Sequence, residues 1–189
     1  MIMTDDESYA VFMDYMKTHD AAQRERKKHR LPMESYAASD CEFFFTICAR
    51  HHGEPFTNPE LAKAIIDSLL WRRRFHNWML FAYCLMPDHL HFLVQLPPTQ
   101  IRYINAGARG IVPEGILDHV GNFKKYTTTQ IWWKAGGTGQ LWQKSSYDRV
   151  IRYNKSIEPV VNYILNNPVR KGLVARWEDY PYSAIVDQW

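Results

Sequence analysis

The chain has 189 residues, a formal net charge of +3 and 46% hydrophobic residues, which predicts one globular domain with a sizeable core. No apolar run approaches the roughly 18 residues that cross a bilayer, and the acidic start does not resemble a signal peptide, so we expect a cytoplasmic protein without a membrane partner. The slight positive charge permits a nucleic-acid partner but does not require one.

Residues 1–40 differ in composition from the rest and predict a helical N-terminal extension, followed by a main domain over 41–189. The cationic cluster from Arg24 to Arg30 has two interpretations, a solvated helix face or an auxiliary contact to phosphates. The three cysteines lack C-x-x-C spacing, so we interpret them as free thiols without a chemical role.

The sequence pattern of the main domain predicts a series of strands and helices. Asn58 and Pro59 are typical of a helix start, and the short sequence "PDH" is typical of a hairpin turn. In chain order, the patterns predict a strand over 41–50, a helix over 58–77, strands over 77–86 and 89–96, a loop over 100–113, a helix over 114–135, a strand near 147–152, a helix over 156–168 that Pro168 ends, and an irregular tail over 169–184. This order predicts an α+β fold with a mainly antiparallel sheet.

The strand "HLHFLVQL" carries His89 and His91 two residues apart. Side chains at i and i+2 of a strand point to the same face, so both imidazoles lie side by side while Leu90 points away. Two neutral imidazoles suit a divalent cation, with further coordination positions left open. A pair of partly buried histidines bonded to their neighbours is the alternative.

The helix "SIEPVVNYILNNP" places Tyr163 and Asn167 four residues apart, on one helix face. A phenol and an amide therefore project together, and Asn167 could serve as a third ligand. The alternative is that Tyr163 belongs to the core and Asn167 only terminates the helix.

Three blocks, "YCLMPDHLHFLVQLP", "LWQKSSYDRVIR" and "VVNYILNNPVRKGLV", closely resemble the REP-associated tyrosine transposases, relatives of single-tyrosine insertion-sequence transposases. The blocks occur in that family's order and cover most of residues 41–185. The resemblance implies a ferredoxin-like HUH nuclease fold, an antiparallel sheet with helices on one face.

The same resemblance implies residue roles. His89, His91 and Asn167 match the metal site for Mg²⁺ or Mn²⁺, and Tyr163 matches the nucleophile that forms a phosphotyrosine bond to the 5′ side of a DNA break. The implied partner is single-stranded or hairpin DNA, such as REP-like palindromes, bound by a monomer or homodimer at the bacterial nucleoid. Tyr147 is a competing nucleophile, but only Tyr163 has a polar residue one helical turn later.

Lysine and arginine side chains interleave with aromatic residues in three segments, a composition that suits phosphates and unpaired bases. The candidates for DNA contact are Lys124, Lys125, Arg149, Arg152, Arg170 and Lys171. Each could equally be a solvated surface charge.

Three functions follow as hypotheses. The first is a metal-dependent transposase that nicks and rejoins DNA through Tyr163. The second is a catalytically idle hairpin-binding protein derived from such an enzyme. The third is a metalloenzyme for small phosphate esters, which would use the histidines but not the tyrosine.

Overall fold

The computed structural model describes residues 41–50, 53–97, 103–105, 111–113, 115–135, 139–152 and 155–189. The predicted extension over 1–40, with its cationic cluster, lies outside the described residues.

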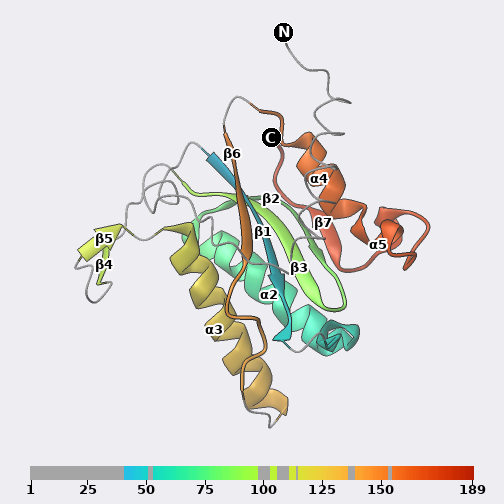
Figure 1. Ribbon diagram of the computed structural model, residues 1–189, viewed down its shortest axis with the longest axis horizontal. Helices are drawn as coiled ribbons and strands as arrows, with labels where there is room; N and C mark the ends of the chain where they lie inside the picture. Colours follow the sequence, from blue (N-terminus) through green and yellow to red (C-terminus); the bar gives the residue numbers. More distant parts are fainter. Residues whose placement is uncertain are drawn as a thin grey trace.

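A five-stranded antiparallel sheet forms the centre of the fold, with strand order β6-β1-β3-β2-β7 (Figure 1). The sequence of β1, α2, β2, β3, α3 and β6 is the ferredoxin-like β-α-β-β-α-β arrangement, so the predicted α+β fold is confirmed. The main elements are β1 (Cys41–Cys48), α2 (Pro59–His76), β2 (Met79–Leu85), β3 (His89–Gln95), α3 (Ile116–Ala135), β6 (Tyr147–Arg152), α4 (Glu158–Leu165), α5 (Asn167–Arg170) and β7 (Ser183–Ile185). Short 3-10 turns lie at η3 (Pro55–Thr57) and η5 (Trp177–Asp179).

Helix α2 begins where the sequence predicts. The Asn58 side chain accepts hydrogen bonds from the backbone N–H groups of Glu60 and Leu61, at 2.9 and 3.2 Å. These bonds satisfy donors that have no partner within the helix. Asn77, with φ of 54°, ends the helix in the left-handed conformation and leads the chain into β2.

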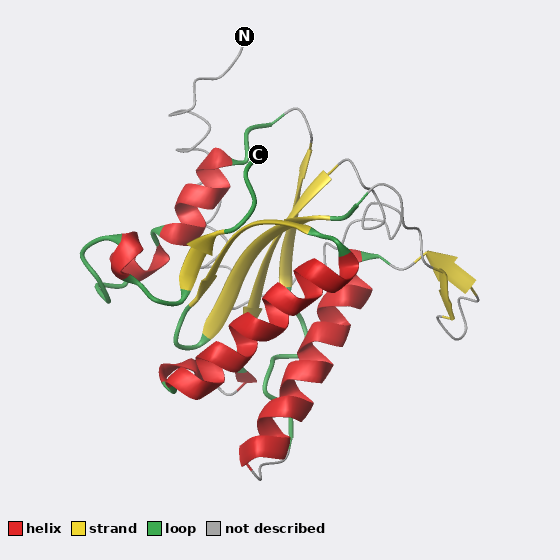
Figure 2. Cartoon of the chain, turned by 180° about the vertical axis from the view of Figure 1, so that it is seen from behind, coloured by secondary structure: helices red, strands yellow, loops and turns green. Residues whose placement is uncertain are grey.

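Helices cover both faces of the sheet (Figure 2). Strand β1 illustrates the division: Phe43 and Phe45 belong to the core beneath α2 and α3, while Phe44 belongs to the core beneath α4. The expectation of helices on one face therefore holds for α2 and α3 but is wrong for α4. The hydrophobic run of β1 and β3 follows from this, because a strand buried on both faces needs apolar side chains in both directions.

Three predicted segments differ from the structure. The predicted loop over 100–113 contains two short paired strands, β4 (Tyr103–Asn105) and β5 (Ile111–Pro113). The tail contributes β7, which pairs with β2 and forms one edge of the sheet. Pro168 does not end the helical segment as predicted but lies in the first turn of α5. A proline is tolerated there because the backbone N–H that it lacks has no partner within the first turn of a helix.

Among the described residues, no helix combines the length and the apolar character needed to span a membrane.

Candidate metal and tyrosine site

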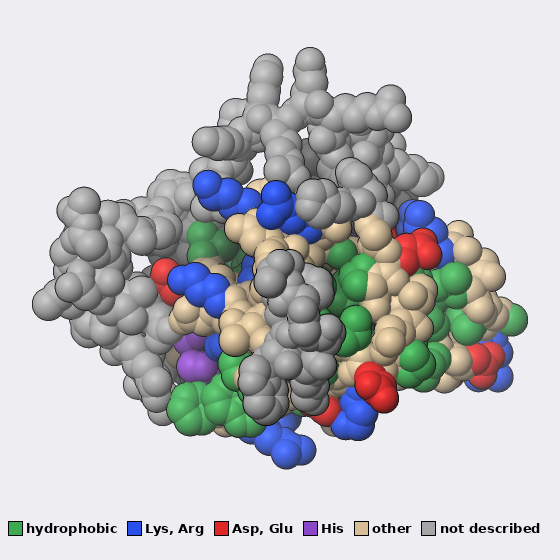
Figure 3. Space-filling view, turned by 90° about the horizontal axis from the view of Figure 1, so that it is seen from below, with side chains coloured by type: hydrophobic (Ala, Val, Ile, Leu, Met, Phe, Trp, Pro, Cys, Tyr) green, Lys and Arg blue, Asp and Glu red, His purple; other side chains and the backbone are tan. Residues whose placement is uncertain are grey.

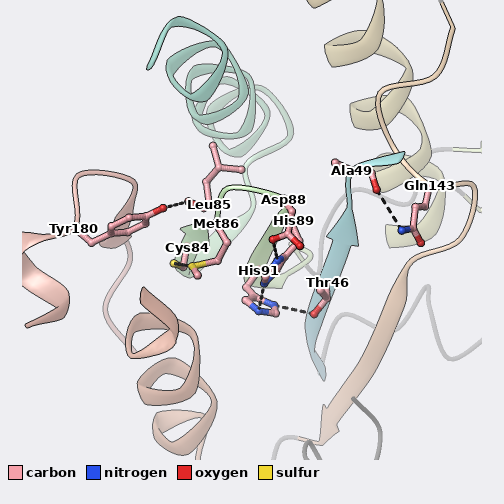
Figure 4. Close-up of polar contacts among 10 residues, drawn as sticks. All are labelled: Thr46, Ala49, Cys84, Leu85, Met86, Asp88, His89, His91, Gln143 and Tyr180. Carbon is pink, nitrogen blue, oxygen red and sulfur yellow. Dashed lines mark hydrogen bonds and ion pairs between the residues drawn. The ribbon is translucent and has the colours of Figure 1, made fainter. Parts of the chain in front are cut away.

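Both histidines of β3 point to the sheet face that α4 covers. Their Nε2 atoms lie 3.0 Å apart, and the ring centroids lie 4.6 Å apart (Figure 4). His91 is 3% exposed, whereas the His89 side chain is 15% exposed. The predicted arrangement on one strand face is present, and His89 forms its solvent-facing side.

Each imidazole makes a hydrogen bond through its other nitrogen. His89 Nδ1 lies 2.5 Å from Asp88 Oδ1, and His91 Nδ1 lies 2.8 Å from Thr46 Oγ1 (Figure 4). A carboxylate can only accept, so His89 donates from Nδ1–H, and in the neutral ring this leaves a lone pair on Nε2 that faces His91. Such outer partners orient histidine ligands in metal sites.

The Thr46 hydroxyl can donate or accept, so it suits either tautomer of His91. Without a cation, His91 Nε2–H donates to His89 Nε2 and the Thr46 hydroxyl donates to His91 Nδ1. With both lone pairs turned to one cation, His91 Nδ1–H would instead donate to Thr46.

The surroundings of His91 keep its ring neutral. Burial is the main cause that lowers the pKa of His91 well below its usual 6.5, and the positive charge that His89 carries when protonated, together with that of Arg170, lowers it further. A hydrogen bond with the Asn167 side chain acts in the opposite direction. A neutral imidazole is the form that binds a metal ion.

Asn167 reaches this site from α5. Its Nδ2 donates to the Tyr163 carbonyl at 2.7 Å, and the residue is 6% exposed. This bond uses the amide nitrogen, so the carbonyl oxygen is the atom available toward His91. Asn167 thus contacts the backbone of the predicted nucleophile and the side chain of His91.

The spacing of the donors fits a hard divalent cation. Two ligands at about 2.1 Å and a right angle, as in octahedral coordination, are separated by about 3.0 Å. The two Nε2 atoms have this separation. Among the described residues, no group of three or more His, Cys, Asp or Glu could hold a metal ion.

Tyr163 lies beside the histidines on the same face of the sheet. Its ring centroid is 5.6 Å from that of His91, and the two rings are inclined at 66°. Phe44 packs against both rings, stacked on His91 at 5.6 Å and edge-on to Tyr163 at 6.0 Å. The structure therefore brings together the four residues predicted from two distant segments.

Tyr163 is only 3% exposed. The exposed Arg170 places its guanidinium carbon 5.1 Å from the centre of the tyrosine ring, a cation–π arrangement. Arg170 therefore lies over one face of the tyrosine ring and places a positive charge beside the site.

The rival Tyr147 lies on the same sheet face, opposite Thr46 in the pairing of β1 with β6. Its hydroxyl oxygen is buried. Thr46 thus separates Tyr147 from His91 in the row of residues across the sheet.

Five of the six predicted DNA contacts can be placed, and they fall into two groups. Arg170 and Lys171 lie near the site, since Arg170 affects the pKa of His91 and Lys171 helps to lower that of Asp88, after the dominant hydrogen bond from His89. Arg149 shares this sheet face through its pairing with Phe44.

Lys124 and Lys125 lie instead on α3, which covers the other face, and Lys124 donates to the Ser145 carbonyl at 3.2 Å. Arg152 ends β6, and its side chain lies outside the described residues.

Two site residues were not predicted from the sequence. Thr46 is the one polar side chain inside the aromatic strand "FFFTI", which is a usable indication of a polar neighbour. Asp88 was interpreted only as a turn residue. Cys84 also faces this side of the sheet, but burial raises the pKa of its thiol to about 12, so it stays protonated, as expected for a cysteine without a chemical role.

Comparisons with known proteins agree with the resemblance of the three sequence blocks. No family model matches the chain. A relative from Haemophilus influenzae, named "Putative REP-associated tyrosine transposase", is 30% identical over 109 residues, which cover 54% of this chain and 56% of that protein. The chain thus spans little more than half the length of this curated relative.

Two solved structures are similar. The structure of a REP-associated tyrosine transposase bound to a REP hairpin has a TM-score of 0.57 and 23% identity, and covers 84% of this chain and 82% of its own. At this identity the likeness establishes a shared fold. A putative transposase from Deinococcus radiodurans R1 has a TM-score of 0.45 and 18% identity, over 75% of this chain and 97% of its own.

Proposed function

We propose that the chain is a metal-dependent transposase that nicks and rejoins single-stranded or hairpin DNA through a covalent bond to Tyr163. One observation carries this proposal: Tyr163 lies 5.6 Å from His91 by ring centroids, in a site where His89, His91 and Asn167 converge. The homology to a transposase and the likeness to a hairpin-bound structure support the same class of substrate.

The residues present fit Mg²⁺ or Mn²⁺. His89 and His91 would bind through Nε2 and Asn167 through its amide oxygen. When bound, the cation would act as a Lewis acid on a non-bridging oxygen of the scissile phosphate. Asp88 would hold His89 in the tautomer that presents an Nε2 lone pair, and the Thr46 hydroxyl would accept from Nδ1–H of His91 in the corresponding tautomer.

Tyr163 supplies the nucleophile. A phenol has an ordinary pKa near 10, so the hydroxyl must lose its proton to water or to a neighbouring base as it attacks phosphorus. The new bond joins the phenolic oxygen to the 5′ phosphate, and the bond to the 3′ oxygen breaks. That oxygen leaves with a proton as a 3′ hydroxyl.

This chemistry suits strand exchange because the phosphodiester is replaced by another phosphoester instead of being hydrolysed. A 3′ hydroxyl from a second strand can therefore attack the phosphotyrosine and release Tyr163. Arg170 and Lys171 lie next to the site and would neutralise the charge of the phosphate during the attack by Tyr163.

A covalent adduct tests the proposal. The protein is incubated with Mn²⁺ and a 5′- or 3′-labelled palindromic hairpin with single-stranded flanks, and adducts are resolved under denaturing conditions. We expect an adduct in the wild type, none in Tyr163→Phe, and an undiminished amount in Tyr147→Phe, the matched control on the same sheet face. An adduct that survives Tyr163→Phe would refute the assignment of the nucleophile.

The burial of Tyr163 favours a second candidate, a hairpin-binding protein that does not cleave. At 3% exposure beneath Arg170, the tyrosine is held as a packed side chain. This candidate predicts tight hairpin binding that is the same in EDTA and in Mn²⁺, with no adduct under either condition.

A further inference from the structure

Three aromatic side chains are exposed together on the outer side of α2 and α3. Trp71 is 50% exposed, Phe75 56% and Tyr126 45%. Trp71 stacks on Phe75 with centroids 4.7 Å apart and planes 12° apart, and on Tyr126 at 6.4 Å and 17°. We call these three residues the aromatic ladder.

The ladder follows from helix geometry. Trp71 and Phe75 are four residues apart on α2, so they occupy one helix face, and α3 lies alongside α2 and adds Tyr126. Figure 3, which views the molecule from below the orientation of Figure 1, shows exposed hydrophobic side chains next to a histidine, with lysine and arginine side chains nearby. Contiguous exposed apolar surface of this kind marks an interaction site.

The charges around the ladder are positive. Arg74 shares the helix face of Trp71, Lys125 precedes Tyr126, and both are exposed. Asp67, one helical turn before Trp71, forms an ion pair with Lys63 at 2.6 Å, and Asp187 forms one with Arg73 of the same helix. The ladder therefore combines nearly parallel rings with cations and neutralised acids.

We infer that the aromatic ladder binds unpaired bases of single-stranded DNA, with Arg74 and Lys125 contacting the phosphates. Bases stack on aromatic rings regardless of sequence, and cations beside the rings follow the backbone. A protein partner would not require the near-parallel planes or the excess of positive charge.

This surface is separate from the metal and tyrosine site. The ladder lies on the helices that cover one sheet face, whereas the histidines point to the face beneath α4. It also lies toward the start of β2, which follows α2 directly, whereas His91 pairs with Cys84 near the end of that strand. The inference thus goes beyond the proposed function and stands without it.

Binding of a fluorescein-labelled oligothymidylate in EDTA tests the inference, because this probe forms no hairpin and EDTA removes divalent cations. We expect Trp71→Ala and Phe75→Ala each to weaken binding about tenfold, as loss of a stacking ring would. Ile185→Ala, at an exposed residue on β7, is the matched control and should bind as the wild type does. Thermal unfolding of each variant checks that the fold is retained.

Two further readouts separate the outcomes. Arg74→Gln and Lys125→Gln should each reduce the slope of log affinity against log salt by about 0.7. Ile185→Ala should leave this slope unchanged. The assay contains no divalent cation and detects no cleavage, so failure of the nucleophile assignment would not affect this result. Equal binding by the wild type and the ladder variants would overturn the inference, as would a DNA-free dimer that Trp71→Ala dissociates without changing DNA affinity.

Discussion

Thr46 Oγ1 lies 2.8 Å from His91 Nδ1, across the pairing of β1 with β3. This bond orients a ring that is almost fully buried and whose Nε2 faces His89. Through it, a hydroxyl on one strand fixes the orientation of an imidazole on the next.

Replacing Thr46 by valine removes this bond with little change in shape. We expect Mn²⁺ affinity to fall by about tenfold, in the range for an outer partner of a metal ligand. The unpaired Nδ1 of His91 should also cost roughly 1 to 3 kcal/mol in the free energy of unfolding. Titration calorimetry and urea unfolding measure the two effects. Thr46→Ser keeps the hydroxyl, and equal losses in both variants would contradict the role of the bond.

Asp88 should matter through both its geometry and its charge. Asp88→Ala removes the acceptor of His89 Nδ1–H, so we expect Mn²⁺ affinity to fall by about 10- to 100-fold. Asp88→Asn keeps an acceptor oxygen without the charge, so its loss should be smaller. Titration of metal-free protein with Mn²⁺, followed by the electron paramagnetic resonance of the free ion, measures both. Wild-type affinity in Asp88→Ala would exclude a positioning role.

Arg170 should contribute to binding of hairpin DNA. Arg170→Gln removes a cation next to the tyrosine and the histidines, so we expect the slope of log affinity against log salt to fall by roughly 0.7 to 0.9. Fluorescence anisotropy at several salt concentrations gives this slope. Lys63→Gln removes one positive charge from α2, away from the site, and serves as the matched control. The assignment fails if both variants change the slope equally.

The ion pair of Asp187 with Arg73 should make stability depend on pH. Its carboxylate accepts from Arg73 and, at 2.7 Å, from the backbone N–H of Leu80, and the Arg73 hydrogen bond is the main cause that lowers the pKa of Asp187. A carboxyl with a lowered folded-state pKa stabilises the protein above its unfolded pKa near 3.9, and this contribution is lost as the pH falls through the folded value.

Asp187→Asn should therefore lower the free energy of unfolding by about 2 kcal/mol at pH 7, since charge-assisted hydrogen bonds are lost. The difference from the wild type should shrink as the pH drops below 4. Urea unfolding at a series of pH values tests this. A difference that is constant from pH 7 to pH 3 would show that the ion pair does not contribute.

Several features follow from the sequence by itself because local backbone geometry determines them. The two-residue period of a strand places His89 and His91 on one face, the helical turn places Asn167 next to Tyr163, and Asn58 caps α2 through its own side chain. Each of these relations spans four residues or fewer. The resemblance of the three blocks to the REP-associated tyrosine transposases added the expectation of a ferredoxin-like fold. It also added the expectation that the histidine pair and Tyr163 meet in one site.

Only the tertiary structure decided which distant groups join them. Thr46 is 45 residues from His91 and meets it through strand register, which depends on how whole strands pair. The position of α4 on the face opposite α2 and α3 brings Tyr163 to the histidines, and the burial of both sheet faces decides that position. The position of Arg170 over one face of the Tyr163 ring and the joining of Trp71 with Tyr126 likewise depend on packing between elements, which no local pattern encodes.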